Sequence, residues 1–385
     1  MITQGLILCG GHGTRLGNIT KRVPKPLIKV NNFTVVEHII KNLSRFGINQ
    51  IFLLCYYKFE LFKKKFHKKK YFGVEIRCIK EKKLLGSSGA LFNVRKKLHR
   101  HFLMCNGDTF FDINISDLAY EYFNKKAIAF LALKKLNDDK RYDQFRITKN
   151  GKLSLDVKKK SKLINSGIYI LSKKIVPYLV KFGSLEKEVF MKLPKNKIFG
   201  KRYNSRFLDM GIKKDLNKLP KFLNFINFKP CLFLDRDGVI NKDNGYVFQK
   251  EKFVWRKNIF KYVKKYNDNN YLVIIITNQS GIGRGFYKES DVKKLHNWMV
   301  NKFRSNGANI DKIYYAPYFK DSKIYKYRLK KNLRKPNIGM IQEAKKDFNI
   351  KMNQSILIGD SETDKQTAIN ANIKFRILSF ESKLI

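Results

Sequence analysis

The stretch CLFLDRDGVIN (Cys231–Asn241) begins as an apolar run and continues into two aspartates, Asp235 and Asp237, with a glycine directly after them. A second stretch, ILCGGHGTRLG (Ile7–Gly17), has the same plan, with glycines in place of the acids. Short apolar runs bounded by turn residues are typical of buried strands. Each half of the chain is therefore predicted to hold a strand that ends in a functional loop.

Strand-like and helix-like segments alternate around both stretches, which predicts an α/β fold. In the first half these segments are Gly5–Cys9, Val35–Gly47, Gln50–Tyr56 and His101–Asp108. In the second half they are Cys231–Asp235, Tyr271–Thr277, Asp291–Phe303, Lys312–Ala316 and Ser355–Asp360. The 385 residues suit two domains, since domains usually have about 100–200 residues. We expect Rossmann-like domains at residues 1–220 and 230–385 with a linker at 221–229, each built on a mainly parallel sheet flanked by helices.

The composition narrows the choice of partners and compartment. There are 81 Lys+Arg against 31 Asp+Glu, a formal net charge of +50. Such an excess attracts nucleic acid, but it is spread along the whole chain, so phosphorylated small molecules are the preferred partners and nucleic acid is not expected. No apolar run approaches the ~20 residues of a membrane span, and the N-terminus does not resemble a signal peptide. The five cysteines lie in apolar stretches without a CxxC pair, which fits reduced thiols in the cytoplasm. A homo-oligomer remains open.

The glycine loop at Gly10–Gly17 fits neither of two common phosphate loops. It lacks the Gly-Lys-Ser/Thr end of a Walker A loop, and Leu16 stands where a dinucleotide fingerprint needs its third glycine. Taken alone, the loop is a turn whose backbone N–H groups can approach a phosphate. It is followed, in order, by the motifs VPKPLIKV (Val23–Val30), LLGSSGAL (Leu84–Leu91), NGDTFFD (Asn106–Asp112), NSGIYIL (Asn165–Leu171), SLEKEVFMKL (Ser184–Leu193) and FLDMGIKKDL (Phe207–Leu216).

With this series, residues 1–216 resemble the sugar-1-phosphate nucleotidylyltransferases, and most of all the heptose-1-phosphate guanylyltransferase branch. The resemblance implies that a sugar 1-phosphate attacks the α-phosphorus of a nucleoside triphosphate and releases pyrophosphate. It implies that Lys25 stabilises charge at the α-phosphate and that Asp108 and Asp209 hold Mg²⁺. The implied binding residues are Gly10, Gly11, Gly13, Thr14 and Arg15 for the triphosphate, Gly86, Ser88 and Gly89 for the nucleoside, Asn106 for the substrates, and Asn165, Glu186 and Lys187 for the sugar. The residues that select the base stay open.

The acid pair in the second half could also begin an EF-hand loop. That alternative fails, because a third acid is missing and Tyr246 stands where the bidentate glutamate is needed. A strand followed by DxDG instead resembles the haloacid-dehalogenase-like (HAD-like) phosphatases. The resemblance continues through TNQSGIGRG (Thr277–Gly285), RKPNIGM (Arg334–Met340) and GDSETD (Gly359–Asp364) and covers residues 231–385. It is strongest to the heptose 1,7-bisphosphate phosphatases, with the histidinol-phosphate phosphatases as near relatives.

This second resemblance implies a covalent mechanism. Asp235 is the expected nucleophile, and Asp237 protonates the leaving alcohol and then activates water. Thr277 would bond the phosphoryl oxygens, and Lys335 with Arg334 would neutralise charge. The implied Mg²⁺ ligands are Asp235, Asp360 and the carbonyl of Asp237, supported by Asp364. The residues expected to face the rest of the substrate are Asn278, Gln279, Ser280 and Arg284.

One departure concerns zinc. Relatives often carry a small cysteine and histidine loop before the RKP motif, but the stretch Tyr314–Pro336 contains neither residue type. The residues that stand at the ligand positions are Ala316, Tyr318, Lys331 and Leu333. We therefore predict no zinc, and a loop that is either mobile or held by the packing of Tyr314, Tyr315, Tyr318 and Phe319.

The two halves together suggest one bifunctional enzyme of nucleotide-heptose biosynthesis. The phosphatase would remove the 7-phosphate of a heptose 1,7-bisphosphate, and the transferase would join a nucleotide, expected to be GMP from GTP, to the resulting heptose 1-phosphate. Two alternatives stay open: the same reactions on another sugar, or one active domain with the other as a binding module. Histidinol-phosphate phosphatase activity is disfavoured, because histidine synthesis has no use for a nucleotidylyltransferase.

Overall fold

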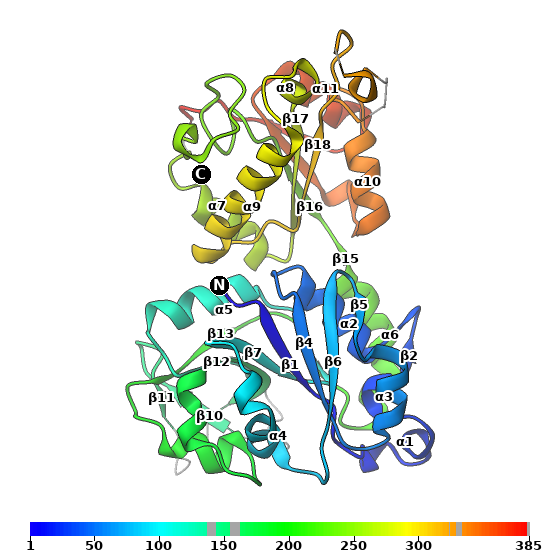
Figure 1. Cartoon of the computed structure of the whole chain (residues 1–385), viewed down its shortest axis with the longest axis vertical. Helices are drawn as coiled ribbons and strands as arrows, with labels where there is room; N and C mark the ends of the chain where they lie inside the picture. The colour runs from blue at the N-terminus through cyan, green and yellow to red at the C-terminus, as the bar shows by residue number, and fades with distance from the viewer. Residues whose placement is uncertain (137–143, 155–161, 323, 329–332, 383–385) are drawn as a thin grey trace. The chain divides into compact units, whose positions relative to one another are not determined.

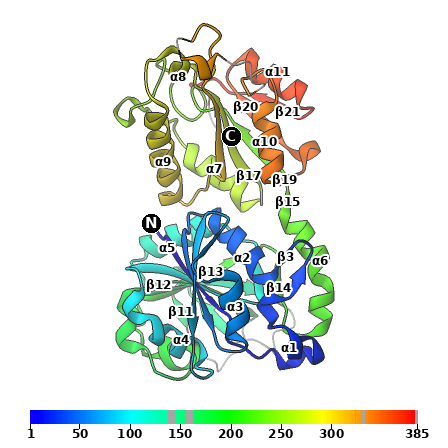
Figure 2. The same ribbon diagram turned by 45° about the vertical axis from the view of Figure 1, so that its right-hand side comes forward.

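The computed structural model describes residues 1–136, 144–154, 162–322, 324–328 and 333–382. The chain forms two compact units, Met1–Leu223 and Asn224–Ile385. Each unit has a sheet flanked by helices (Figures 1 and 2), so the expected α/β class is confirmed. Residues 221–229, which we expected to be a linker, form the end of helix α6 (Lys213–Asn227) and strand β15 (Phe228–Lys229).

The N-terminal unit is built on a mixed sheet with a parallel centre. Its strands follow the order β11-β10-β12-β7-β1-β4-β6-β5, and β9 joins β12 to β13. Strands β7, β1, β4 and β6 pair in parallel, whereas β12 runs antiparallel to β7 and β9. The strands are β1 (Gln4–Leu8), β4 (Gln50–Cys55), β5 (Lys69–Tyr71), β6 (Val74–Lys80), β7 (His101–Asn106), β9 (Ala129–Lys135), β10 (Gln144–Ile147), β11 (Leu153–Ser154), β12 (Leu163–Ser172) and β13 (Ile198–Tyr203).

Short pairs of strands and further α-helices also belong to the described part of this unit. The strand pairs are β2 (Lys29–Val30) with β3 (Phe33–Thr34), and β8 (Thr109–Phe111) with β14 (Phe207–Asp209). The helices are α1 (Asn18–Arg22), α2 (Val35–Ser44), α3 (Phe59–Phe66), α4 (Gly86–Val94) and α5 (Ile115–Asn124). Helix α2 begins at a capping box, in which the backbone N–H of Thr34 donates to Glu37 Oε2 at 2.6 Å. Such a box satisfies N–H groups that the first helical turn leaves unpaired.

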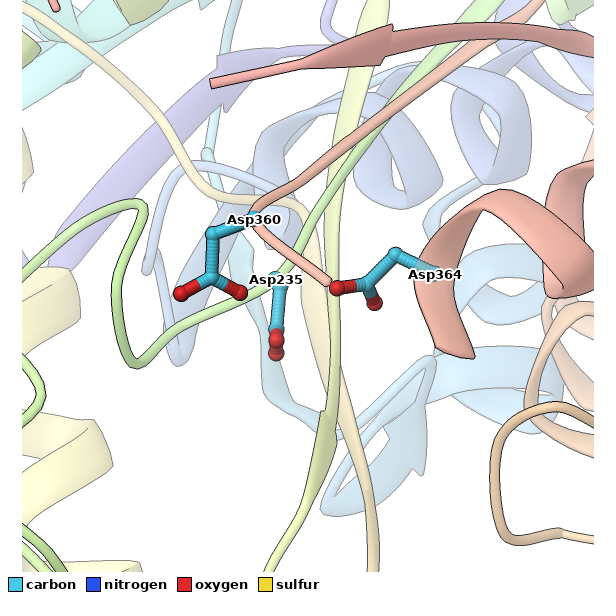
Figure 3. A group of neighbouring side chains, drawn as sticks. All are labelled: Asp235, Asp360 and Asp364. Atoms are coloured by element: carbon cyan, nitrogen blue, oxygen red, sulfur yellow. The ribbon is translucent and has the colours of Figure 1, made fainter. Parts of the chain in front are cut away.

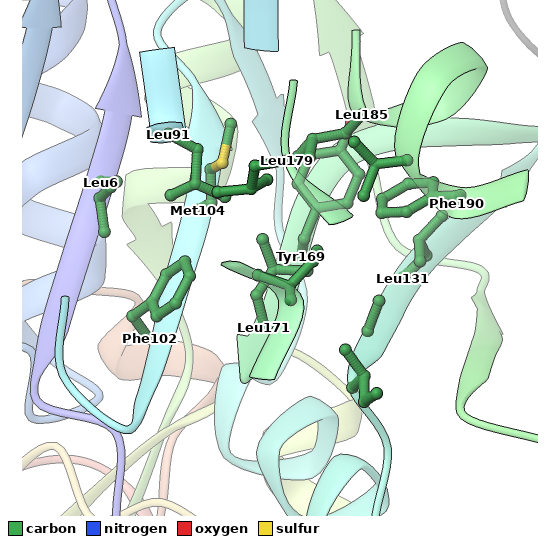
Figure 4. Close-up of a cluster of buried hydrophobic side chains, with 14 of the residues drawn as sticks. Leu6, Leu91, Phe102, Met104, Leu131, Tyr169, Leu171, Leu179, Leu185 and Phe190 are labelled. Atoms are coloured by element: carbon green, nitrogen blue, oxygen red, sulfur yellow. The ribbon is translucent and has the colours of Figure 1, made fainter. Parts of the chain in front are cut away.

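The apolar core of the N-terminal unit lies between its sheet and the segments that cover it (Figure 4). Leu6 of β1, Met104 of β7 and Leu171 of β12 are fully buried there. Leu91 of α4 and Phe190 pack against them from outside the sheet. Burying such side chains contributes about 1.5–3 kcal/mol each, which fixes the strand ends that carry the site.

The C-terminal unit has a parallel sheet in the order β18-β17-β16-β20-β21. These strands are β16 (Cys231–Leu234), β17 (Leu272–Asn278), β18 (Lys312–Ala316), β20 (Ile356–Gly359) and β21 (Lys374–Ile377), and β15 pairs separately with β19 (Asn349–Ile350). The helices are α7 (Ile259–Asp268), α8 (Ser280–Arg284), α9 (Glu289–Ser305), α10 (Gly339–Asp347) and α11 (Glu362–Asn370). Because β17, β16 and β20 are neighbours, the polar residues at their carboxyl ends meet at one edge.

Across the described residues, no helix combines the length and the apolarity that a membrane crossing requires.

Candidate active sites

A cavity of about 280 Å³ lies at the carboxyl ends of the parallel strands in the N-terminal unit. Several of the predicted residues line it together: Gly10, Gly11, Gly13, Lys25, Gly86, Asn106 and Asp108. Gly13 has φ +68°, and a Cβ there would lie 2.9 Å from Thr20 Cγ2. The positive φ and this close approach therefore both require glycine at this bend.

Lys25 and Asp108 form an ion pair inside this cavity. The Nζ atom of Lys25 donates to Asp108 Oδ2 at 2.7 Å, and the lysine side chain is 9% exposed. Asp209 lies opposite Thr109 in the β8–β14 pair, which brings its backbone next to that of Asp108. The pair of acids suits a hard cation that completes its shell with phosphate and water. The strand pairing thus brings the backbone of Asp209 near the Lys25–Asp108 ion pair.

A hydrogen-bonded group joins the predicted sugar residues. Glu186 Oε1 accepts from Asn165 Nδ2 at 3.0 Å and from the Tyr169 hydroxyl at 2.5 Å. Its other oxygen accepts from the Ser87 hydroxyl at 3.3 Å. The sequence predicted Asn165 and Glu186 but missed Tyr169 and Ser87, although both lie inside the quoted motifs.

Some predicted residues of the N-terminal unit lie away from the cavity lining. Thr14, Arg15 and Lys187 are exposed. Ser88 is buried and its hydroxyl accepts the backbone N–H of Val180 at 3.0 Å, while its neighbour Ser87 lines the cavity. A Cβ on Gly89 would lie 2.6 Å from the carbonyl oxygen of Lys181, so this glycine is needed for close packing of α4.

Glu81 is a lining residue that the sequence analysis did not single out. It follows β6, is 4% exposed, and lines the cavity together with Gly10 and Gly86. Burial raises the pKa of Glu81 to about 7, although the backbone N–H of Leu85 opposes the rise. The N-terminal site therefore contains a buried carboxyl group besides Asp108 and Asp209.

Three aspartates meet at the edge of the C-terminal sheet. Asp235 follows β16, Asp360 follows β20, and Asp364 lies in the first turn of α11. One carboxylate oxygen from each lies within 4.8 Å of the others (Figure 3). Burial raises the pKa of Asp235 to about 7, with Lys335 opposing the rise and Asp364 adding to it. A cluster of oxygen ligands in which like charges raise a pKa fits a divalent cation such as Mg²⁺.

Lys335 joins two of these aspartates. Its Nζ lies 2.9 Å from Asp235 Oδ2 and 2.5 Å from Asp364 Oδ1, and its side chain is 3% exposed. Burial opposes the charge on Lys335, but the two carboxylates outweigh it and raise its pKa. Asn278 fixes the backbone here, because its Oδ1 accepts the Lys335 N–H at 3.0 Å. The ammonium is thereby held against the expected nucleophile.

Asp237, Thr277 and Gln279 share a second hydrogen-bonded group. Gln279 Nε2 donates to Asp237 Oδ2 at 3.1 Å and to Thr277 Oγ1 at 3.0 Å. The hydroxyl of Tyr287 donates to Gln279 Oε1 at 3.0 Å and fixes the amide. Gln279 was expected to face the substrate; it is 2% exposed and bonds the expected acid instead. Tyr287 was not anticipated.

The remaining predicted residues of the C-terminal unit are Ser280, Arg284 and Arg334. Ser280 begins α8 and Arg284 ends it, with the guanidinium of Arg284 3.6 Å from the centre of the Phe319 ring. Burial and the nearby charge of Arg284 lower the pKa of Arg334, which precedes Lys335. The guanidinium groups of Arg284 and Arg334 thus lie close enough for the charge of one to act on the other.

Glu289, the first residue of α9, accepts hydrogen bonds from the stretch that precedes the RKP motif. The hydroxyls of Tyr315 and Tyr327 donate to Glu289 at 2.6 and 3.0 Å. Tyr315 and Phe319 were expected to hold this stretch by packing, and Tyr315 does so through a hydrogen bond. Of the residues that stand where relatives carry zinc ligands, Ala316 ends β18, while Lys331 lies outside the described residues.

Comparisons with known proteins agree with these two sites. The sequence models of the families Nucleotidyl transferase and Polynucleotide kinase 3 phosphatase match residues 4–197 and 232–377. The D-glycero-alpha-D-manno-heptose-1,7-bisphosphate 7-phosphatase of Burkholderia mallei is 45% identical over 38% of this chain and 78% of its own. The D-glycero-alpha-D-manno-heptose 1-phosphate guanylyltransferase of Campylobacter jejuni is 36% identical over 55% of this chain and 96% of its own.

The crystal structure of HddC from Yersinia pseudotuberculosis is similar over 57% of this chain and 99% of its own, with 27% identity and a TM-score of 0.50. The expectation of an enzyme with a nucleotidyltransferase half and a phosphatase half is confirmed. The chain therefore belongs to the nucleotidyl transferase family through its N-terminal unit and, through its C-terminal unit, to the family of the curated 7-phosphatases.

Proposed function

We propose that this chain carries out two consecutive steps in making a nucleotide-activated heptose. The C-terminal domain removes the 7-phosphate of D-glycero-D-manno-heptose 1,7-bisphosphate. The N-terminal domain then transfers GMP from GTP to the heptose 1-phosphate and releases pyrophosphate. The observation that carries this proposal is the presence, in one chain, of the Lys335–Asp235 pair and the Lys25–Asp108 pair. The two relatives named above divide the same two reactions between two proteins.

In the phosphatase step, Asp235 attacks the phosphorus atom and the bond from phosphorus to the sugar oxygen breaks. Asp237 gives its proton to that oxygen, and Thr277 and Lys335 bond the phosphoryl oxygens. Water then attacks the aspartyl-phosphate, Asp237 takes a proton from it, and phosphate leaves. Mg²⁺ held by Asp235, Asp360 and Asp364 would supply positive charge next to the phosphoryl group.

In the transferase step, the protein has to position two phosphates and neutralise charge. Lys25 lies beside Asp108, where the α-phosphate of the nucleotide would be held, and Asp108 with Asp209 would hold Mg²⁺. Asn165 and Glu186 would bind the sugar hydroxyls. We place both steps in the cytoplasm, where the buried free cysteines stay reduced.

The test uses the full chain with Mg²⁺ and no added zinc. It is given heptose 1,7-bisphosphate with equal GTP, ATP, CTP, UTP and dTTP, and the products are identified by mass spectrometry. We expect GDP-heptose, which is lost in both Asp235→Asn and Lys25→Ala. Accumulation of heptose 1-phosphate without any nucleotide sugar would refute the transferase half. Unchanged bisphosphate would refute the phosphatase substrate and favour another sugar phosphate.

A further inference from the structure

Arg236 stands between the two catalytic aspartates and is completely buried. Its side chain is 0% exposed, while the side chain of Asp237 is 20% exposed. Its backbone N–H donates to Asp235 Oδ1 at 2.7 Å. Its guanidinium instead bonds the carboxylate of Asp237, with Nε 3.1 Å and Nη2 2.8 Å from Oδ2. The same two nitrogens lie 3.2 and 3.0 Å from Oδ1.

The guanidinium is itself held by two groups behind it. Nη2 donates to the carbonyl oxygen of Val247 at 2.7 Å, and Nη1 lies 3.2 Å from His296 Nε2 of helix α9. Burial and the charge of Arg236 lower the pKa of His296 well below its usual value. The imidazole is therefore neutral and can accept from Nη1. The contacts with Val247 and His296 thus hold the guanidinium of Arg236 in the orientation in which it bonds Asp237.

Asp237 also accepts hydrogen bonds from two amides. Asn241 Nδ2 donates to Oδ1 at 2.9 Å, and Gln279 Nε2 donates to Oδ2 at 3.1 Å. With Arg236, these donors leave the carboxylate little rotational freedom. Paired hydrogen bonds between a guanidinium and a carboxylate are among the strongest in proteins and also fix geometry.

We propose that Arg236 is a positioning residue for the phosphatase reaction, and that it aims the Asp237 carboxylate first at the leaving oxygen and then at the attacking water. The inference rests on the proposed phosphatase function. A general acid or base has to lie within hydrogen-bond reach of the proton it moves. The grip of Arg236, supported by His296, supplies that placement without any contact between Arg236 and the substrate.

If Arg236 had a purely structural role, its loss should lower kcat/KM equally for all substrates. Substrates with different leaving groups therefore distinguish a structural role from a positioning role. A sugar alcohol has to receive a proton as its bond to phosphorus breaks, whereas p-nitrophenol leaves as a stable anion. With p-nitrophenyl phosphate, formation of the aspartyl-phosphate therefore does not need Asp237, but its hydrolysis does. The parameter kcat/KM reports the first irreversible step, and kcat includes the hydrolysis.

The experiment compares Arg236→Met with the wild-type full chain on heptose 1,7-bisphosphate and on p-nitrophenyl phosphate. We expect kcat/KM for the bisphosphate to fall by about 10²- to 10⁴-fold, the usual contribution of general acid–base catalysis. We expect kcat/KM for p-nitrophenyl phosphate to change little, while its kcat falls and a burst of nitrophenolate appears. An equal fall of kcat/KM for both substrates would overturn the proposal.

Two further variants keep the test decisive if Arg236→Met does not fold. His296→Leu removes the acceptor behind Arg236. It should change kcat/KM and kcat for the two substrates in the same pattern as Arg236→Met, but by smaller factors. His296→Gln can restore an acceptor there and should recover most of the loss. No difference between these two variants would contradict the positioning role.

Arg304→Met is the matched control. Arg304 lies in the last turn of helix α9 and donates to Asn309 Oδ1 at 3.2 Å. Nearby Asp311 accepts the backbone N–H of Val273 at the start of β17. Thr277 lies at the other end of that strand. This variant should leave the ratio of kcat/KM for heptose 1,7-bisphosphate to kcat/KM for p-nitrophenyl phosphate unchanged.

A wild-type chain that hydrolyses neither substrate would refute the proposed function itself. That outcome is separate from an unchanged kcat/KM ratio in Arg236→Met, which would refute only the positioning role.

Discussion

Lys335 places its Nζ atom 2.9 Å from Oδ2 of Asp235, and both side chains are largely buried. The lysine belongs to a loop and the aspartate follows the central strand β16, so only the folded sheet edge brings them together. A buried ammonium beside the proposed nucleophile would offset the repulsion between its carboxylate and an incoming phosphate.

Lys335→Met should strongly lower phosphatase activity. Loss of a single group that stabilises charge in a transition state costs about 10²- to 10³-fold in kcat. The variant also leaves Asp235 and Asp364 without their cation, so its C-terminal domain should be less stable. Release of inorganic phosphate from the bisphosphate measures the loss. Nucleotide transfer to added heptose 1-phosphate serves as the internal control and should persist.

Lys25→Met should give the opposite pattern. The Lys25 ammonium lies at Asp108 in the N-terminal cavity, and its removal should lower pyrophosphate release by about 10²-fold or more. Phosphate release from the bisphosphate should be unchanged, because Lys25 belongs to the other compact unit. Pyrophosphate and phosphate are measured separately in the same preparation. Loss of both activities would contradict two independent catalytic units.

The sequence could predict the strand ends but not the direction of neighbouring side chains. Asp235 and Asp360 were predicted because a residue that follows a parallel strand must lie at its carboxyl edge. Arg236 stands between two predicted acids and was missed, since its direction depends on His296 from a distant helix. The predicted Ser88 faces Val180, and its unpredicted neighbour Ser87 lines the cavity. One residue turns a helix by about 100°, which a motif alone does not resolve.

The contacts along the antiparallel strand β12, and the hydrogen bonds that Glu289 accepts, illustrate a second limit of prediction from the sequence. Asn165 was predicted as a sugar residue, but its contacts with Tyr169 and Glu186 depend on the pairing of β12 with β9 and β7. Strand direction is not encoded in a short apolar run. Likewise, Glu289 lies far along the chain from Tyr315 and Tyr327. The sequence therefore suggested aromatic packing for Tyr315, but not the hydrogen bonds that Glu289 accepts from both hydroxyl groups.

Glu289 should make the stability of the C-terminal domain depend on acid pH. The Tyr315 hydroxyl, together with Lys293 and Tyr327, lowers the pKa of Glu289 to about 2 despite some burial. Because the folded pKa is depressed, this contribution is complete above about pH 4.5 and is lost as the pH falls toward about 2. Glu289→Gln should therefore flatten the fall in unfolding free energy across that range.

The chain's two tryptophans, Trp255 and Trp298, allow this domain to be followed alone, since both lie in the C-terminal unit with their rings 5.4 Å apart. Urea unfolding is followed by their fluorescence between pH 2 and about pH 6. Glu251→Gln is the control, because Glu251 is an exposed acid that pairs with the exposed Lys250 at 3.7 Å. Equal slopes in the wild type and Glu289→Gln would contradict the role of this carboxylate.

Gly238→Ala should weaken the cation site through Asp360. Gly238 has φ +76°, and a Cβ there would lie 1.7 Å from Asp360 Oδ2, so the carboxylate has to move. We expect a higher Mg²⁺ concentration for half-maximal phosphatase activity and a lower maximal rate. Gly245→Ala separates this clash from backbone strain. Gly245 has φ +71° but its added Cβ would meet nothing within 4 Å, so it bears only the strain of about 1–3 kcal/mol. If both variants raise the Mg²⁺ requirement equally, strain in the backbone explains the loss and the link between Gly238 and Asp360 is refuted.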